Sequence, residues 1–263
     1  MARPLTGPGS RTGAGQPEPL GAAPDGSGVN FAIASSSAEA IFVSLFDAAG
    51  SETARVQLPG RLGDVFHGHI AGIGVGARYG LRAHGPYKPQ SGHRFNCAKL
   101  LVDPYATRLD RPFKLDTSLF DARIHGAPKD EIDSAPFVPK AIVEAPELFQ
   151  TPRRPIAEWR GLVIYEMHVR GFTKRQPKIP GSIRGTFAGL AHDASVEYLK
   201  RLGVTAVELL PVAAWIDERH LPPLGLGNYW GYNPIAMLAP DPRLAPGRRC
   251  APPLTRCMAR GSP

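Results

Sequence analysis

The strongest constraint on the fold is a strand–helix–strand pattern between residues 161 and 212. LVIYEMHV at 162–169 and VTAVELLPV at 204–212 are almost continuously apolar, which is typical of strands buried on both faces of a parallel sheet. Between them lies an amphipathic segment that ends at Gly203 and has apolar residues at helical spacing, namely Val196, Leu199 and Leu202. Together these segments predict one βα unit of a parallel sheet.

A different period governs the chain before this point. From residue 28 onwards the apolar residues alternate, in the runs VNFAIAS, AIFVSLF, TARVQL, VFHGHIA and RYGLRAH. These runs start about 10 to 14 residues apart, and the DAAG sequence at 47–50 suits a hairpin turn. The pattern predicts a small antiparallel β-sandwich of the immunoglobulin-like type.

The chain is therefore expected to be multidomain, with an all-β part followed by an α/β part. We expect a disordered tail at 1–17, the sandwich at 18–105, an extended connector at 106–160 and the α/β part at 161–244. In the stretch 245–263 the apolar residues follow neither helical nor strand periodicity, and the stretch is rich in Arg, Pro and Cys. Such a tail is typical of a shifted reading frame or a truncated gene model; a functional basic arm is the alternative.

Composition excludes several classes of protein. The acid-free ends at 1–17 and 243–263 contribute seven of the eight net positive charges, so the body has no basic stripe and we expect no nucleic-acid partner. Cys97, Cys250 and Cys257 are odd in number and lack CxxC spacing, which argues against a disulfide framework or a zinc site. No apolar run reaches the length of about 18 residues that a membrane span needs, and the N-terminus lacks the apolar core of a secretory signal. We expect a cytoplasmic protein with no membrane partner.

Six segments, taken in order, point to one family. They are PLGAAPDGSGVNFAIAS, LPGRLGDVFHGHI, YGLRAHGPYKPQSGHRFNCAKLLVDPYA, VIYEMHVRGFT, YLKRLGVTAVELLPV and LGNYWGYNPIAMLAP. In these segments the chain resembles bacterial glycogen debranching enzymes, the isoamylase-like branch of the α-amylase superfamily of glycoside hydrolases. The resemblance implies a carbohydrate-binding-module-like sandwich at 18–105, followed by a (β/α)₈ TIM barrel that starts near Gly161. Because a complete barrel takes about 250 residues, 161–244 would hold only the first two strands of a truncated barrel.

The activity that the resemblance implies is hydrolysis of α-1,6 branches in glycogen or limit dextrin with retention. This reaction needs a carboxylate nucleophile and a carboxylic acid about 5 to 5.5 Å apart. The superfamily takes its catalytic acids from later barrel strands, so we expect no catalytic residue in this sequence and no activity from this chain alone. Whether it acts as an enzyme stays open, and a non-catalytic glucan-binding or regulatory protein is the alternative. Two carboxylates and water suffice, so no cofactor and no metal is implied.

Three polar residues of the two apolar runs are expected to be structural. Glu166 and Glu208 lie inside the runs and not at the strand ends, where barrel catalysis takes place. His168 is likewise interpreted as a hydrogen-bonded histidine of the barrel wall.

The candidate substrate-binding residues follow the second strand, in NYWGYNP at 228–234. The resemblance implies that Tyr232 stacks on a glucosyl ring, since axial C–H groups of a sugar pack well on an aromatic face. Tyr229 and Asn233 are expected to support it, whereas Trp230 either supports it or packs in the core. The expected partner is a branched α-glucan.

Overall fold

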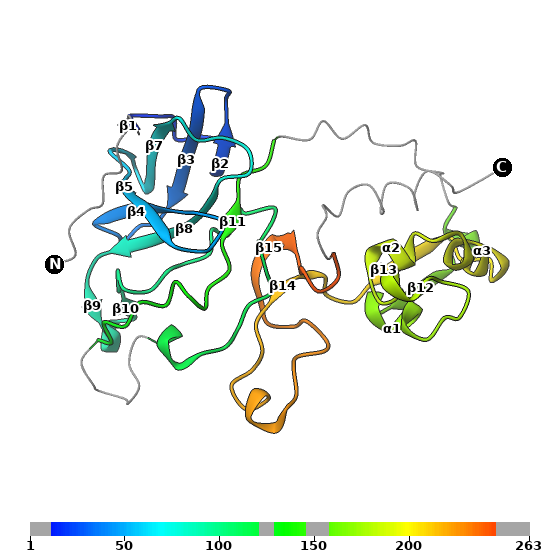
Figure 1. Cartoon of the computed structure of the whole chain (residues 1–263). Coiled ribbons are helices and arrows are strands. Elements are labelled where there is room, and N and C mark those ends of the chain that lie inside the picture. Colours follow the sequence, from blue (N-terminus) through cyan, green and yellow to red (C-terminus); the bar gives the residue numbers. More distant parts are fainter. Residues whose placement is uncertain (1–11, 121–128, 146–157, 246–263) are drawn as a thin grey trace.

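The computed structural model describes residues 12–120, 129–145 and 158–245, and Figure 1 shows them as a β-rich N-terminal half and a C-terminal part that contains the helices. Residues 1–11 and 246–263, which include most of the two tails expected at the ends, lie outside the described residues.

Two antiparallel sheets form the N-terminal half. The first contains β1 (Thr12–Gly13), β2 (Gly21–Pro24), β3 (Gly28–Ala34), β6 (Gly60–Leu62) and β7 (Val65–Ala71). The second contains β4 (Ala40–Phe46), β5 (Glu52–Gln57), β8 (Arg78–His84) and β11 (Ala141–Ile142). Their orders are β1-β7-β3-β2, with β6 also on β7, and β11-β8-β4-β5. The predicted antiparallel β-sandwich is confirmed, but the expectation of a disordered tail does not hold for β1, which pairs with β7.

The core of the sandwich lies between the two sheets. Side chains of β7 alternate between buried and half-buried positions, as the period of two predicts. Phe31 of β3 meets Tyr79 of β8 edge-to-face, with ring centroids 5.1 Å apart. Burying each large apolar side chain stabilises the fold by about 1.5 to 3 kcal/mol. The expected hairpin at 47–50 is also present, and there Ser51 donates its backbone N–H to the Asp47 carboxylate.

The segment expected to be an extended connector is in part folded onto the sandwich. Its strand β11 pairs with β8, and its Asp133 carboxylate accepts two hydrogen bonds, of 2.9 and 3.0 Å, from the buried guanidinium of Arg82. Lys99 donates from Nζ to the carbonyls of Ser118 and Ile132. The sequence did not indicate this packing because buried cations that bond to loop carbonyls leave no periodic pattern. The turn η2 (Thr117–Leu119) and a hairpin of β9 (Tyr87–Lys88), η1 (Pro89–Ser91) and β10 (His93–Arg94) complete this region.

The strand–helix–strand unit is present in the C-terminal part. Strand β12 (Ile164–Met167) pairs in parallel with β13 (Ala206–Leu209), and α3 (Asp193–Arg201) lies between them in the chain. The two strands are not buried on both faces, however, since Ile164 is 55% exposed and Val207 is 41% exposed. No other strand of the described chain pairs with either one, so their outer edges and one face remain uncovered. The remaining elements are α1 (Val169–Lys174), α2 (Phe187–Leu190), η3 (Trp159–Gly161) and η4 (Gly181–Ile183).

An antiparallel hairpin follows the parallel pair. Its strands are β14 (Ala213–Trp215) and β15 (Pro234–Pro240), joined by a long loop that contains η5 (Pro222–Leu224). Ala214, Ala236 and Ala239 of the hairpin belong to the same buried cluster as the core of the sandwich. Figure 1 accordingly shows the hairpin between the sandwich and the helices. None of the helices in the described ranges has the length and apolar character needed to cross a bilayer.

Candidate functional site

The long loop between β14 and β15 presents three exposed aromatic side chains. Tyr229, Trp230 and Tyr232 are 43, 56 and 68% exposed, and we call this group the aromatic platform. The rings of Tyr229 and Trp230 meet edge-to-face with centroids 5.3 Å apart. Large rings that remain in water despite their apolar area are suited to contact a ligand, and sugars in particular pack on aromatic faces.

Asn228 fixes the shape of this loop. Its backbone N–H donates to the carboxylate of Asp217, and its side-chain amide donates to the carboxylate of Glu218. Its side-chain oxygen accepts from the N–H of Gly231, which adopts a left-handed conformation with φ of 79°. Its carbonyl accepts from the indole N–H of the buried Trp215. One asparagine therefore connects the platform to the hairpin, a role that the sequence analysis did not predict for Asn228.

His168 joins the platform to the parallel pair. Its Nδ1 accepts the backbone N–H groups of Arg170 and Gly171 at the start of α1, so the ring proton is on Nε2, which donates to the carbonyl of Tyr229 at 2.7 Å. The imidazole also stacks on the Tyr229 ring, with centroids 4.1 Å apart and planes 10° apart. A Cβ at Gly171 would lie 2.7 Å from the Tyr229 hydroxyl, so glycine makes this contact possible. The interpretation of His168 as a structural, hydrogen-bonded residue agrees with this geometry.

A cavity of about 250 Å³ lies beneath the platform. Trp215 forms part of its wall, and the guanidinium of Arg243 lies 4.1 Å from the Trp215 ring centroid. Arg243 also holds the buried Asp241 carboxylate with two hydrogen bonds of 2.8 Å. Because Arg243 is paired with Asp241 and packs on Trp215, its side chain stabilises the base of the loop between β14 and β15. The other lining residues are His168, Arg170, Gly227, Asn228, Tyr229 and Leu244.

The predicted substrate-binding residues occupy different positions around the platform. Tyr229 lines the cavity, while Tyr232 is the most exposed of the three rings and makes no ring contact within the described ranges. Asn233 is half-buried, and its backbone carbonyl accepts the N–H of Ile216 across the hairpin. The structure therefore places Tyr229 and Trp230 together and leaves Tyr232 free to face a ligand. Their roles in binding stay predictions.

The structure brings Glu166 and Glu208 together. They are directly opposite each other on β12 and β13, and both are exposed. Catalysis by two carboxyl groups requires different environments, so that one is protonated while the other is ionised. These two occupy equivalent positions on an open sheet, and neither lines the cavity beneath the platform. This placement agrees with a structural role.

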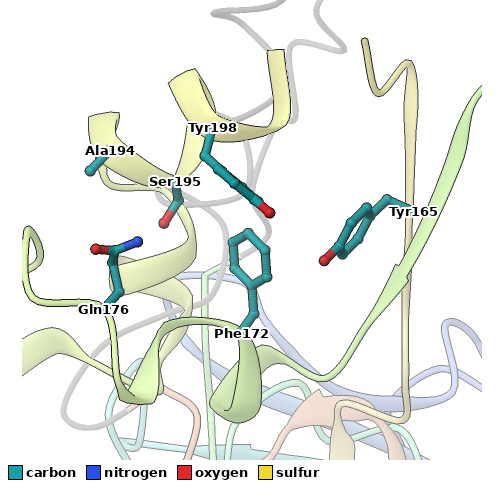
Figure 2. Close-up of a pocket in the computed structure, with 6 residues that line it drawn as sticks. All are labelled: Tyr165, Phe172, Gln176, Ala194, Ser195 and Tyr198. Carbon is teal, nitrogen blue, oxygen red and sulfur yellow. The ribbon is translucent and has the colours of Figure 1, made fainter. Parts of the chain in front are cut away.

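A second cavity, of about 400 Å³, lies beside the parallel pair. Figure 2 shows three aromatic rings gathered there: Tyr165 from β12, Phe172 from α1 and Tyr198 from α3. The Phe172 ring centroid lies 5.9 Å from that of Tyr165 and 6.1 Å from that of Tyr198. Gln176, Ala194 and Ser195 complete the lining. No carboxylate lines this cavity, and no cluster of His, Cys, Asp and Glu in the described ranges has the arrangement of a metal site.

Comparison with known families and proteins finds matches to the sandwich and to most of the whole chain. Residues 19–106 match carbohydrate-binding module 48, the isoamylase N-terminal domain. The chain is 49% identical over 241 residues to the glycogen debranching enzyme of Yersinia enterocolitica, covering 91% of this chain and 36% of that protein. It is 47% identical over 235 residues to the glycogen debranching enzyme of Klebsiella pneumoniae, covering 88% and 35%. The chain thus spans about a third of the length of the curated relatives that it matches.

Solved structures show the same fold. The pullulanase of Paenibacillus barengoltzii in complex with maltohexaose and α-cyclodextrin superposes with a TM-score of 0.61 and 21% identity. The match covers 92% of this chain and 34% of the pullulanase. The catalytic module of the glycogen-degrading pneumococcal protein SpuA has the same TM-score at 23% identity, covering 86% and 32%.

Proposed function

We propose that this chain, which is the counterpart of the N-terminal third of bacterial glycogen debranching enzymes, builds one side of an α-1,6-glucan cleft and contributes no catalytic carboxylate of its own. The observation that supports this most is the 49% identity to a glycogen debranching enzyme over 91% of the chain. With so little of the chain unmatched, the likeness includes both the sandwich and the aromatic platform.

The domain assignment follows from the same likeness. Residues 18–105 would be the carbohydrate-binding module, 106–160 the connector that packs on it, and 161–244 the first two strands of a (β/α)₈ barrel. The parallel pairing of β12 with β13 supports the barrel assignment, because βα units are the building blocks of that fold. The uncovered strand edges and the exposed Ile164 and Val207 are then surfaces that further barrel strands bury.

The chemical role of the chain would be substrate positioning. In retaining hydrolysis a nucleophile and an acid lie on either side of the glycosidic bond, about 5 to 5.5 Å apart. The opposed Glu166 and Glu208 are both exposed on β12 and β13, and neither lines the cavity beneath the platform, so they do not meet this need. Tyr232 would stack on one glucosyl ring, while Tyr229 and Asn233 support the loop that carries it. The partner is a branched α-glucan such as glycogen or its limit dextrin. We also propose a cytoplasmic location, because of the likeness to glycogen debranching enzymes.

The test is a chimera. Residues 1–245 are joined to the part of the Yersinia enterocolitica enzyme that follows its matched segment, and release of reducing ends from a branched limit dextrin is measured. We expect the chimera to hydrolyse the dextrin. A folded chimera that binds the dextrin without cleaving it would contradict the proposal and favour the non-catalytic, glucan-binding alternative.

The platform is tested in the same chimera by Tyr232→Ala. Loss of the stacking ring is expected to lower kcat/KM by about 10- to 100-fold, because sugar stacking that persists in the transition state is worth a few kcal/mol at most. Leu62→Ala is the matched control, since Leu62 is an equally exposed apolar residue of the sandwich. Equal losses from both substitutions would remove Tyr232 from the binding site.

A further inference from the structure

The cavity beside the parallel pair is surrounded by aromatic rings that remain accessible. Tyr165, Phe172 and Tyr198 form most of its wall, and we call these three residues the aromatic groove. Tyr165 and Phe172 are half-buried, and Tyr198 is 38% exposed. Figure 2 shows the Phe172 ring between the rings of Tyr198 and Tyr165. Apolar rings that gather around a hollow and still contact water are typical of a surface that binds another molecule.

The groove lies where the helices stop covering strand β12. Side chains alternate along β12, so Tyr165 and Met167 lie on the same face of the strand. Met167 is buried in a cluster with Phe187 of α2 and Leu199 of α3, whereas Tyr165 is only half-buried. Only β12, α1, the turn after α1 and α3 line the groove, so no further helix of the described chain covers it.

The backbone of β12 is also incomplete on one side. Within the described ranges β12 pairs with β13 alone, so its other edge presents unpaired N–H and C=O groups. Such an edge accepts a further strand, and neighbouring strands of a parallel sheet are connected by helices that pack on its faces. A partner that adds a parallel strand to β12 therefore also brings a helix next to that strand. The free edge and the aromatic groove together match one βα unit.

We propose that the free edge of β12 and the aromatic groove form a docking surface for a separate polypeptide that carries the remaining βα units of a debranching enzyme. The identity of this partner rests on the proposed function, whereas the surface rests on the geometry. The chain spans 36 and 35% of two glycogen debranching enzymes, so about two thirds of their length lies outside the match. A strand of the partner pairs with β12, and an amphipathic helix places an apolar side chain among the three rings.

A second copy of this chain does not fit the surface in this way. Within the described ranges the α-helices α1, α2 and α3 all contribute to the cluster around Met167 of their own chain. A copy therefore offers unpaired strand edges but no free amphipathic helix for the groove. The occupant has to supply both a strand and a helix.

The association is tested by co-expression, which lets the two parts fold together. The full 263-residue chain carries an affinity tag, and the part of the Yersinia enterocolitica enzyme that follows its matched segment is produced as a separate, untagged polypeptide. We expect the untagged polypeptide to co-purify with this chain in equimolar amounts. Size-exclusion chromatography with light scattering gives the mass of the complex.

The groove is tested by competition. The parent and a variant, each with its own tag, are co-expressed with a limiting amount of the second polypeptide, and their shares in the complex are measured by mass spectrometry. Tyr198→Ala removes one ring at an exposed position of α3 and is expected to lower its share at least about fivefold. Tyr198→Phe keeps the ring and should compete like the parent. Lys200→Ala is the matched control, because Lys200 is exposed on the same helix and does not line the groove.

Three results overturn the proposal: no co-purification of the second polypeptide, a homodimer of this chain in its place, or equal shares for Tyr198→Ala and Lys200→Ala. These outcomes do not depend on hydrolysis. A complex that forms but leaves the limit dextrin intact, together with an inactive chimera, contradicts the proposed function alone. An active chimera whose two parts do not associate as separate polypeptides contradicts this docking surface alone.

Discussion

Lys140 shows how a single residue ties the segment after the sandwich to the core. Its side chain is fully buried, with Nζ donating to the carbonyls of Ala135 and Val138 at 2.6 Å and lying 4.6 Å from the Phe46 ring centroid. Burial, helped by the positive charge of Arg111, lowers the pKa of Lys140 from 10.5 to about 8. The folded protein therefore loses this proton at a lower pH than the unfolded chain does.

This difference predicts a pH-dependent stability. Between pH 8 and 10.5 the unfolded state binds more protons, so the contribution of Lys140 to the free energy of unfolding increases as the pH rises. Relative to Lys140→Met, the parent should gain about 1 to 2 kcal/mol between about pH 7 and about pH 9.5, measured by urea unfolding with circular dichroism. The same pH dependence in both proteins would show that the ammonium is not destabilised by its site.

His168 is the second residue whose role can be measured. It caps α1 through Nδ1 and holds the Tyr229 carbonyl through Nε2, so His168→Ala removes a cap and a stacking partner at once. We expect a loss of about 1 to 2 kcal/mol in the free energy of unfolding. All tryptophans of the chain lie after residue 158, so tryptophan fluorescence reports on this part selectively. His220→Ala, at an exposed position of the same part of the chain, should change stability by less than about 0.5 kcal/mol, and an equal effect of both variants would rule out the capping role.

At the scale of elements, the parallel pair carries a like-charge contact. Glu166 and Glu208 face each other across β12 and β13, and directly opposed like charges destabilise a sheet. Glu208→Gln is therefore expected to raise stability by a few tenths to about 1 kcal/mol at low salt, and less at high salt, where the repulsion is screened. Glu197→Gln on the exposed face of α3 serves as the control and should not stabilise. A destabilising Glu208→Gln would indicate that the two carboxylates share a cation or a proton.

The same elements show what the sequence can predict. The strands of the sandwich follow from periodicity, because alternate side chains of a strand such as β7 are buried between the two sheets. The helix α3 was predicted from the spacing of Val196, Leu199 and Leu202, of which the structure buries Leu199 and leaves Leu202 48% exposed. The antiparallel hairpin of β14 and β15 was not predicted. Its pairing is irregular, with register shifts on both sides of Ala214, and it is buried on the sandwich by small alanines that give no strong apolar signal.

The candidate site was predicted only in part, for a related reason. Tyr232 and Tyr229 were expected at the site because of the resemblance to glycogen debranching enzymes. Core packing was left open for Trp230, which the structure leaves 56% exposed. The roles of Asn228 and His168 depend on contacts between residues up to 61 positions apart, which no local pattern contains.

At the scale of the whole molecule, the described residues contain two separate hydrophobic cores, and only one of them is enclosed by complete sheets. The sandwich and the hairpin share one buried cluster, whereas the parallel pair and its helices form a separate cluster with uncovered strand edges. The platform lies on the loop of the hairpin, and within the described ranges the only carboxylates paired across β12 and β13 are Glu166 and Glu208.

The most direct test is an assay of hydrolysis by the purified 263-residue chain. Release of reducing ends from a branched limit dextrin is measured for the parent, Glu166→Gln and Glu208→Gln, with the chimera as the active reference. We expect no release above background from any of the three, because neither a glycosyl-enzyme intermediate nor protonation of the leaving oxygen is available. Hydrolysis by the parent that either substitution abolishes would contradict this account and would make the opposed glutamates catalytic.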